Sequence, residues 1–370
     1  MNVIVLGGYG NFGARICRAL ANTSGIELVI AGRDLAKGSA LAQELGTRCA
    51  RIDAADPKLA NVLRDFGAGI VIHTAGPFQD QGYAVPFAVA EAGAHYIDLA
   101  DGRRFVCDFP QALDAAFRQH GRIGISGAST VPALSSAVVN ALTRGWCSVT
   151  DIDFCIAPAQ TAPRGIATMA AVLNYCGAPV QVWQGGRWVT RHGWASPEKV
   201  HYARLRPRLA ALCDIPDLEL FPAQYLGVQS VMFRAALELG ISQRSLALIG
   251  ALRRMGIIPK PERLAGLLNR SADLLDIFGS ALGGMVVRVR GTDAGGAQRA
   301  RAWHIAADND HGPEIPCMAA ILLARRIAAG GESQIGAFSS MGLLELDEFE
   351  PEFRKWGMAT DHCDDQLCCK

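Results

Sequence analysis

The stretch GGYGNFG at residues 7–13 restricts what this chain can fold into more than any other part of its sequence. It follows the apolar run Val3–Leu6 and precedes a segment with the composition of a helix. Within it, Gly8, Gly10 and Gly13 match the pattern G-x-G-x-x-G. Between a buried strand and a helix, these glycines allow a tight turn, close approach of a diphosphate to the backbone, and close helix packing.

The turn therefore predicts a dinucleotide site. The helix that follows, at about 11–21, would direct its free N–H groups and the positive end of its dipole at the phosphates. The predicted contacts are Gly8, Tyr9, Gly10, Asn11, Phe12 and Gly13. A sharp strand-to-helix turn without any ligand is the alternative, and the surrounding sequence has to decide between the two.

The end of the next predicted strand, residues 27–31, indicates which coenzyme would bind. NAD sites favour a carboxylate at this point, where it meets the adenosine ribose. This chain has Gly32, which leaves room, then Arg33, and Lys37 one helical turn later. These cations would attract a 2′-phosphate, so NADP(H) is predicted and NAD(H) is the less favoured coenzyme. The alternative is that Arg33 and Lys37 are solvated surface charges.

Helix-like and strand-like segments then alternate as far as residue 126. The predicted helices are 34–45, 56–65, 80–92 and 105–119, and the predicted strands are 48–52, 69–73, 95–98 and 122–126. This alternation predicts an α/β fold with a doubly wound parallel sheet of the Rossmann type. Asp53, just past the third strand, is a candidate for the adenine edge, with a helix-capping role as the alternative.

The segment after the fourth strand contains small residues followed by a rigid one. Ala75, Gly76, Pro77 and Phe78 are predicted to lie against the nicotinamide-side ribose, at the switch point of the sheet. A plain Gly-Pro turn is the alternative.

From about residue 150 the sequence changes to an alternation of polar and apolar residues, which is typical of antiparallel strands. Strands are predicted at 151–157 and in hairpins at 180–191 and 285–306, and helices at 165–176, 228–239, 243–254 and 261–278. We expect a second α+β domain with a mixed or antiparallel sheet, whose open face would serve to form a homodimer.

The composition narrows the partners and the location. A formal net charge of +1 gives no overall bias toward nucleic acid or an anionic membrane, so a small-molecule substrate is expected. Arg253 and Arg254 interrupt the most apolar region, so no transmembrane segment is predicted. The start of the chain does not resemble a signal peptide, which predicts a cytoplasmic protein.

The eleven cysteines have no CxxC spacing and are expected to be reduced. A cluster at 362–369 could bind a metal, but it lies in an acidic terminus that is poor in aromatic residues. We predict a solvated tail there and no metal site.

Several motifs together resemble the saccharopine dehydrogenase-like oxidoreductases. They are GGYGNFG, AGR at 31–33, AGPF at 75–78, HYIDLADGR at 95–103 and SGASTVPALSSAV at 126–138. The similarity continues in GGMVVRVRG at 283–291, RAWHIAA at 301–307, GPEIPCMAA at 312–320 and GLLELDEF at 342–349.

The resemblance implies an NADP-binding Rossmann domain, a second domain that covers the cofactor cleft, and C-terminal helices that return to the first domain. The expected domains are then 1–127 (Rossmann), 128–310 (substrate and dimerisation), 311–350 (returning helices) and 351–370 (acidic, Cys-containing tail). Saccharopine-forming relatives carry an acidic turn where this chain has residues 128–132, so the resemblance favours a substrate other than saccharopine.

Reduction of a polar double bond needs a proton donor near the nicotinamide and groups that hold the substrate. Asp98 and Asp101, after the fifth strand, are candidate catalytic residues, and Arg103 is a candidate substrate-binding residue. An Asp in this position also commonly caps the following helix, which is the alternative.

Three hydroxyl residues, Ser126, Ser129 and Thr130, precede the apolar helix predicted at 132–143 and are candidates for substrate binding. Simple N-capping is the equal alternative. His304, in a predicted strand, could donate a proton with a pKa near working pH, or it could be a hydrogen-bonded side chain of the sheet.

Taken together, the sequence predicts an NADP-dependent oxidoreductase. It would transfer hydride to an imine, a carbonyl or an activated double bond of a small or amphiphilic substrate. The alternative function is that of a redox sensor or scaffold that binds NADP without turnover.

Overall fold

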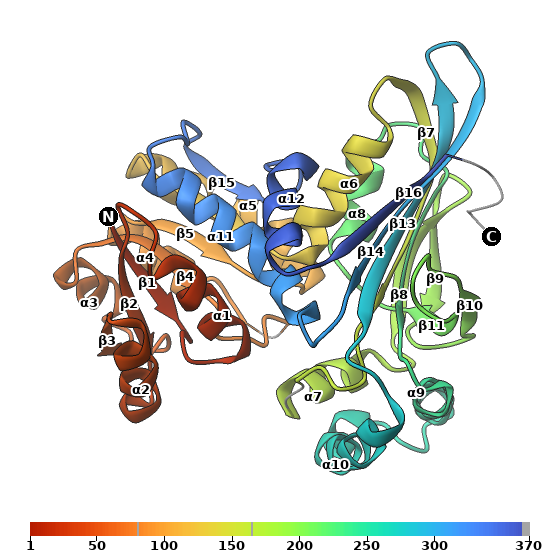
Figure 1. Cartoon of the computed structure of the whole chain (residues 1–370), viewed down its shortest axis with the longest axis horizontal. Coiled ribbons are helices and arrows are strands. Elements are labelled where there is room, and N and C mark those ends of the chain that lie inside the picture. Colours follow the sequence, from red (N-terminus) through yellow and green to blue (C-terminus); the bar gives the residue numbers. More distant parts are fainter. Residues whose placement is uncertain (80, 164–165, 365–370) are drawn as a thin grey trace. The chain divides into compact units, whose positions relative to one another are not determined.

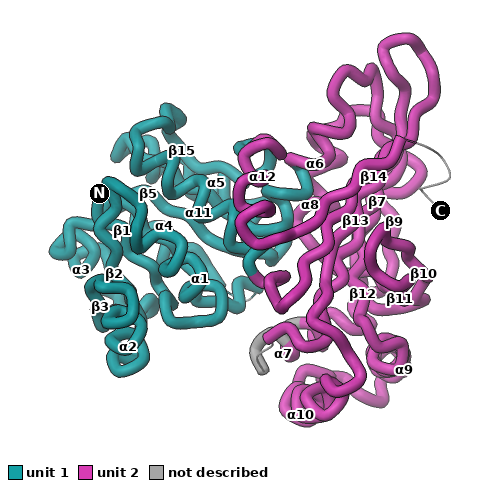
Figure 2. The backbone as a smooth tube through the Cα atoms, in the orientation of Figure 1, with its two compact units in different colours: residues 1–136, 314–344 teal, residues 137–313, 345–370 magenta. Residues whose placement is uncertain are grey.

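The computed structural model describes residues 1–79, 81–163 and 166–364. The chain forms two compact units, each made of two separate stretches (Figure 2). Unit 1 consists of Met1–Ser136 and Glu314–Leu344, and unit 2 of Ala137–Pro313 and Glu345–Lys370.

Unit 1 is built on a seven-stranded sheet (Figure 1). Its strands are β1 (Asn2–Leu6), β2 (Glu27–Gly32), β3 (Arg48–Arg51), β4 (Ala68–His73), β5 (His95–Asp98), β6 (Ile123–Ser126) and β15 (Gly336–Ser339). Their order is β15-β6-β5-β4-β1-β2-β3, and all neighbours are parallel. The strand order reverses direction on the two sides of β1, so the predicted doubly wound fold is confirmed.

Helices cover the sheet of unit 1, which explains why its central strands are continuous apolar runs. Val3–Val5 and Ile70–Ile72 are wholly buried. Right-handed crossovers place α1 (Asn11–Leu20) and α2 (Leu35–Leu45) on one face of the sheet. They place α3 (Leu59–Asp65), α4 (Ala84–Glu91) and α5 (Arg103–Gln119) on the other face.

The last part of unit 1 comes from a stretch late in the sequence. Helix α11 (Ile315–Ala328) contacts α1, where Glu314 forms an ion pair with Arg15. Arg325 of α11 also donates to the carbonyl oxygen of Ala19 at 3.0 Å. Of the segment predicted to return to the Rossmann domain, α11 and β15 lie in unit 1, whereas α12 (Leu346–Lys355) lies in unit 2.

Unit 2 is built on a nine-stranded mixed sheet. Its strands are β7 (Trp146–Ala157), β8 (Pro179–Gln184), β9 (Trp188–His192), β10 (Glu198–Val200), β11 (Arg208–Leu212), β12 (Ser230–Ala236), β13 (Gly283–Asp293), β14 (Gln298–Ala307) and β16 (Ala359–Cys363). The main order is β10-β11-β12-β7-β13-β14-β16, with β8 pairing with β12 and β9. Strands β12 and β7 are parallel and the other pairs antiparallel, so the expected mixed sheet is confirmed.

One face of this second sheet is apolar, whereas the other is polar. On one face Phe154 packs against Phe233 and against Phe221 of α8 (Asp217–Gln224), with ring centroids 5.1 and 5.7 Å away. Helices α7 (Ile166–Tyr175), α9 (Gly240–Arg254) and α10 (Ala265–Leu275) gather at one end of unit 2 around a shared apolar cluster (Figure 1). A kinked turn at Thr130–Leu134, in which Val131 is extended (φ −125°, ψ 127°), leads into α6 (Ser135–Leu142). Among the described residues, no helix is long and apolar enough to cross a bilayer.

Three expectations about the second half were wrong. The predicted helix at 228–239 is strand β12, because pairing with β7 and β11 outweighs the helix propensity of its Ala and Leu residues. Part of the segment predicted to be a solvated tail is strand β16, since Ala359–Cys363 pairs with β14. Cys363 is disulfide-bonded rather than reduced. Residues 365–370 of the predicted tail cluster lie outside the described residues.

Candidate functional site

The carboxyl edge of the unit 1 sheet brings together the turns that follow β1 to β6, which is where open α/β sheets bind ligands. The turns after β4, β5 and β6 touch one another. A Cβ atom at Gly102 would lie 3.3 Å from the carbonyl oxygen of Phe78, and one at Gly127 would lie 3.4 Å from that of Ala100. Most of the residues predicted from the sequence therefore lie along one edge.

The glycine turn has the close contacts that require glycine. Gly7, rather than Gly8, takes the left-handed conformation, with φ of +79°. A Cβ atom at Gly13 would lie 2.2 Å from the carbonyl oxygen of Gly7, so a larger residue would separate α1 from the turn. At Gly10 the same atom would meet only Gly7 within 4 Å. That single contact, with the Gly7 carbonyl oxygen, is 3.1 Å long, and the other directions around the position predicted to face a diphosphate are open.

The N-terminus of α1 fits an anion. Gly10 is its N-cap residue and provides no side-chain hydrogen bond, and the first turn contains no acidic residue. Asn11 and Phe12 are exposed there. The first N–H groups of α1 and its positive dipole end are thus left for an external partner.

Tyr9 takes the space that Gly32 was expected to leave for a phosphate. A Cβ atom at Gly32 would lie 2.5 Å from the ring of Tyr9, and the Tyr9 hydroxyl accepts a hydrogen bond from the Asp34 N–H at 2.8 Å. The expectation about Gly32 is therefore wrong, since its missing side chain lets Tyr9 connect the glycine turn to the start of α2.

The two predicted phosphate-binding cations are exposed at the end of β2. Asp34 caps α2 by accepting hydrogen bonds from the N–H groups of Ala36 and Lys37. The Lys37 ammonium lies 3.7 Å from the Asp34 carboxylate, so part of its charge is already balanced. Arg33 is exposed and is the stronger of the two candidates.

Asp53 is exposed after β3, and its carboxylate accepts a hydrogen bond from the Ala55 N–H at 3.0 Å. This bond stabilises a local turn, as in the capping alternative, but it occupies one carboxylate oxygen only. The second oxygen could still meet an adenine edge.

The segment after β4 is held firmly by internal bonds. The Thr74 hydroxyl donates to the Leu6 carbonyl oxygen at 2.9 Å, and the Gln81 amide donates to the carbonyl oxygens of Ala75 and Pro77. Phe78 turns inward, with its ring 5.1 Å from that of His73. Its backbone, together with that of Ala75, Gly76 and Pro77, is what could face a ribose.

Comparison with known proteins agrees with this geometry. Residues 3–125 match the family model described as the saccharopine dehydrogenase NADP binding domain. These residues belong to that family. The matched segment contains the glycine turn, the end of β2 and the turns after β3 to β5. It is therefore an NAD(P)-binding domain.

Individual relatives extend the likeness. A carboxyaminopropylagmatine dehydrogenase from Synechocystis sp. is 28% identical over 142 residues, which cover 36% of this chain and only 35% of that protein. Saccharopine dehydrogenase (L-Glu forming) from Saccharomyces cerevisiae matches 98% of this chain and 99% of its own, with a TM-score of 0.71 and 13% identity. A homospermidine synthase from Legionella pneumophila, solved with NAD, covers 98% and 91% with a TM-score of 0.62 and 8% identity. At such identities the structural matches show a shared fold.

Within this saccharopine dehydrogenase-type domain, Asp98 is wholly buried. Its Oδ1 atom accepts hydrogen bonds from the N–H groups of Ala100 (2.9 Å) and Gly127 (2.7 Å) and from the Ser126 hydroxyl (3.1 Å). Burial raises the pKa of Asp98 to about 6, although the bonds from Gly127, Ala100 and Ser126 oppose the shift. These contacts favour the structural alternative for both Asp98 and Ser126.

Asp101, in the same turn of the domain, is in a different position. The residue is exposed and its carboxylate accepts a hydrogen bond from the Gln79 amide at 2.9 Å. Poor solvation of the carboxyl group raises its pKa above the ordinary value, even though the residue as a whole reaches the surface. Arg103, two residues later, opens α5 and is buried.

Ser129 and Thr130 lie at the start of the kinked turn that precedes α6. Ser129 is the N-cap residue but makes no side-chain capping hydrogen bond, so the capping alternative is wrong for it. Both residues are mostly buried. Their hydroxyl groups are candidates for binding a substrate atom.

His304 lies in unit 2, on β14. Its Nδ1 atom accepts a hydrogen bond from the Ala203 N–H at 3.2 Å, and burial followed by repulsion from Arg288 lowers its pKa to about 4. The expected pKa near working pH is therefore wrong. The ring is neutral and serves to hold the 201–205 loop against the sheet.

One buried pair was missed by the sequence reasoning. His73, the last residue of β4, lies 3.0 Å from the Tyr96 hydroxyl through its Nδ1 atom, and burial lowers its pKa to about 4. Because His73 is the last residue of β4, the pair supports the turn that follows this strand. The signal available in the sequence was a polar residue ending an otherwise apolar strand.

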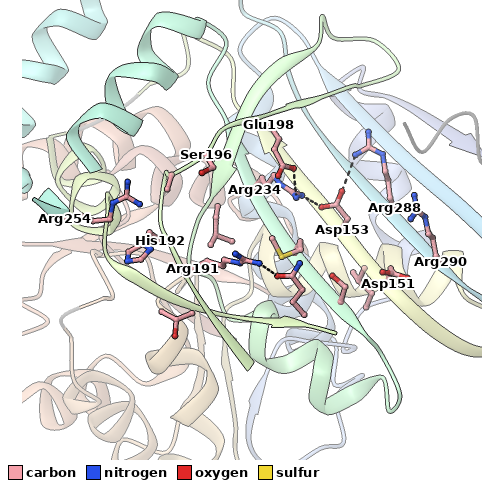
Figure 3. A pocket seen from close by; sticks show the side chains of 17 residues that line it. Asp151, Asp153, Arg191, His192, Ser196, Glu198, Arg234, Arg254, Arg288 and Arg290 are labelled. Carbon is pink, nitrogen blue, oxygen red and sulfur yellow. Dashed lines mark hydrogen bonds and ion pairs between the residues drawn. The ribbon is translucent and has the colours of Figure 1, made fainter. Parts of the chain in front are cut away.

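The open face of the unit 2 sheet carries a polar hollow of about 590 Å³ (Figure 3). Arg234 pairs there with Asp153 and with Glu198 (2.9 Å), while Arg288 lies 3.8 Å from Asp153. The charged residues that line the hollow are Asp151, Asp153, Arg191, Glu198, Arg234, Arg254, Arg288 and Arg290. Much of this charge is balanced within the sheet itself.

Proposed function

We propose that this protein is an NADP(H)-dependent oxidoreductase that transfers hydride to an imine, a carbonyl or an activated double bond of a small or amphiphilic substrate. The observation that carries the proposal is the glycine turn, with an uncrowded Gly10 and an α1 N-terminus free of side-chain caps. The family match of residues 3–125 supports the same conclusion.

NADP(H) is favoured over NAD(H) by the charge at the end of β2. Arg33 is exposed and Lys37 follows one turn later, so a 2′-phosphate would gain two cationic partners. Asp34 weakens this preference without reversing it, because its carboxylate binds the α2 backbone and lies near Lys37.

The chain itself has to hold the coenzyme, orient the acceptor and deliver a proton, while a bound nicotinamide supplies the hydride. Asp101 is the proposed proton donor, since it is exposed at the carboxyl edge and its pKa is raised. Ser129 and Thr130 are proposed to bind the substrate. Asp98, Ser126 and His304 are assigned structural roles because Asp98 Oδ1, the Ser126 hydroxyl and His304 Nδ1 already form hydrogen bonds inside the protein.

Titration calorimetry with NADPH and NADH tests the coenzyme part, and the absence of binding by either at millimolar levels would overturn it. A panel of imines, aldehydes and enones with NADPH then tests the chemistry. Binding of NADPH without oxidation of it across the panel would favour the second candidate, a redox sensor or scaffold that does not turn over.

A homodimer formed through the open face of the unit 2 sheet is also proposed. The hollow there holds alternating acidic and basic side chains, which a two-fold related copy could match. Light scattering coupled to gel filtration measures the mass in solution. A dimer that persists in Arg290→Glu with Arg191→Glu would show that another surface forms it.

A further inference from the structure

Exposed apolar side chains are concentrated in one part of unit 2. Of the sixteen large hydrophobic residues that are exposed in the described part of the chain, eight lie between residues 241 and 278. They are Ile241, Leu248, Met255, Ile257, Leu267, Leu274, Ile277 and Phe278. Exposed apolar side chains concentrated in this way mark an interaction site more often than singly scattered ones do.

The exposed residues of α9 and α10 follow the same spacing. In α9, Ile241 and Leu248 are seven residues apart and 64% and 60% exposed. In α10, Leu267 and Leu274 are also seven apart and 65% and 76% exposed. Seven residues are almost two helical turns, so each pair lies on one stripe of its helix. Each helix thus has an apolar stripe that faces outward, while Leu246 and Ile249 of α9 and Ala265 of α10 are buried in the unit.

A cation lies between the two apolar residues of each stripe. Arg244 follows Ile241 by three positions and precedes Leu248 by four, and Arg270 stands in the same relation to Leu267 and Leu274. Apolar residues alternating with arginine along one exposed stripe are typical of helices that lie in a membrane interface, where long cationic side chains reach toward headgroups.

The charge of the whole segment has the same sign. Between residues 240 and 278 the exposed basic residues are Arg244, Arg254, Lys260, Arg263 and Arg270, while the exposed acidic residue is Asp273. Arg254 also lines the hollow of Figure 3. The near-neutral charge of the complete chain therefore hides a local excess of positive charge around the apolar stripes.

An apolar pocket of about 380 Å³ opens among the same helices. Thirteen of its eighteen lining residues are apolar, and they include the buried Trp194 and Leu268 and Leu275 from α10. Ile241, the first residue of the α9 stripe, also lines it. The pocket is therefore continuous with the exposed apolar surface, and it has the size of a small-molecule site.

We infer that the α9–α10 surface, defined as residues 240–278, docks unit 2 on an anionic lipid surface and that the pocket receives an alkyl chain from it. The inferred partner is a lipid bilayer interface, because the cations complement anionic headgroups while the apolar stripes complement the acyl region. The inference deepens the proposed function, since an enzyme docked in this way would act on a lipid-borne substrate. The docking itself needs no coenzyme.

The docking is tested with the full-length protein and sedimented vesicles, either of phosphatidylcholine alone or mixed with an equal amount of phosphatidylglycerol. The wild type is expected to bind the mixed vesicles. Leu248→Asp with Leu274→Asp should weaken this binding at least about tenfold, because buried leucine surface is lost. Arg244→Gln with Arg270→Gln should weaken it by about thirtyfold on the anionic vesicles only.

The matched control is Leu226→Asp with Ile335→Asp, which makes the same changes at exposed apolar residues outside the surface. It should bind the vesicles as the wild type does. No sedimentation of the wild type, or equal loss in the control pair, would overturn the docking. So would a lipid-free dimer that the Leu248 and Leu274 variant dissociates, because the surface would then join two copies. Failure of the proposed function would appear separately, as lost NADPH binding with vesicle binding intact.

The pocket is tested with cis-parinaric acid, a fatty acid whose fluorescence rises in apolar surroundings. Ala272 lines the pocket, so Ala272→Trp should fill it and abolish the fluorescence increase while vesicle binding is retained. Retained NADPH binding and circular dichroism would show that this variant folds. Equal fluorescence in the wild type and in Ala272→Trp would overturn the assignment of the alkyl chain to this pocket.

Discussion

The two halves of the carboxyl edge of unit 1 use their polar groups in opposite ways. The turns after β1 and β2 leave the α1 N-terminus uncapped and Arg33 exposed, so these groups face outward. The turns after β5 and β6 bind one another, because Asp98 accepts three hydrogen bonds within the domain. The coenzyme side therefore presents its polar groups outward, whereas Asp98 and Ser126 on the predicted chemistry side use theirs to hold the turns together.

The largest expected effect is at Gly13. Gly13→Ala would place a Cβ atom 2.2 Å from the Gly7 carbonyl oxygen, so α1 must shift away from the turn. We expect NADPH binding to be lost and the free energy of unfolding to fall by about 3 kcal/mol. Calorimetry and urea unfolding measure the two effects. Gly266→Ala in α10 meets no atom within 4 Å and should change stability by no more than about 1 kcal/mol. If Gly13→Ala bound NADPH with wild-type affinity, the glycine turn would not be part of the coenzyme site.

The next prediction concerns the effect of Asp98 on the free energy of unfolding. The pKa of Asp98 is about 6 in the folded protein against 3.8 ordinarily, so the folded state holds this proton more tightly than the unfolded chain. The contribution to stability is complete below about pH 4 and is lost as the pH rises through about 6. Relative to Asp98→Asn, the wild type should lose about 3 kcal/mol over this range in urea unfolding.

A carboxylate with the opposite shift is the control for Asp98. Hydrogen bonding to Arg118 lowers the pKa of Asp114, so its contribution is present above the ordinary pKa and lost as the pH falls. Asp114→Asn should therefore show the opposite slope against pH. A difference between wild type and Asp98→Asn that does not vary with pH would contradict the assigned burial.

The next prediction tests whether Asp101, an exposed acid in the turn after β5, donates the proton. Asp101→Asn keeps the hydrogen-bond acceptor for Gln79 but cannot donate a proton as an acid. Turnover should fall by about a hundredfold while the dissociation constant for NADPH stays unchanged. Asp108→Asn, which removes an exposed carboxylate of α5, is the matched variant and should leave turnover alone. Unchanged turnover in Asp101→Asn would leave the proton donor elsewhere.

The smallest effect concerns the choice of coenzyme. Arg33→Glu should lower NADPH affinity by about tenfold, because an exposed carboxylate would repel the 2′-phosphate, with NADH affinity unchanged. Arg187→Glu makes the same charge change at an exposed site in unit 2 and should affect neither coenzyme. If Arg33→Glu lowered the affinities for NADPH and NADH equally, Arg33 would not contact the 2′-phosphate.

Sequence reasoning succeeded where the physics is local. Alternating strands and helices in residues 1–126 and the hairpins at 180–191 and 285–306 were predictable from periodicity. Strand β12 was not, because the Ala and Leu residues at 235–239 favour a helix and the pairing with β7 and β11 makes 230–236 a strand. The surroundings of individual side chains could not be predicted from the sequence either.

The burial of Asp98, the lowered pKa of His304 and the ring of Tyr9 over Gly32 all depend on contacts distant in the sequence. A motif gives the residue type at a position, but it does not give the groups that surround it. The glycine turn was predictable because its constraint is steric and local, whereas the proton donor depends on which acid remains exposed after folding.

The late origin of β15 and α11 has a consequence for how the protein is made. The ribosome synthesises β1 to β6 first, yet the edge of their sheet and the partner of α1 are supplied only by residues 314–344. A nascent chain can therefore complete unit 2 over most of its length before unit 1 can close. Premature termination before β15 would leave β6 as an unpaired edge strand, open to aggregation.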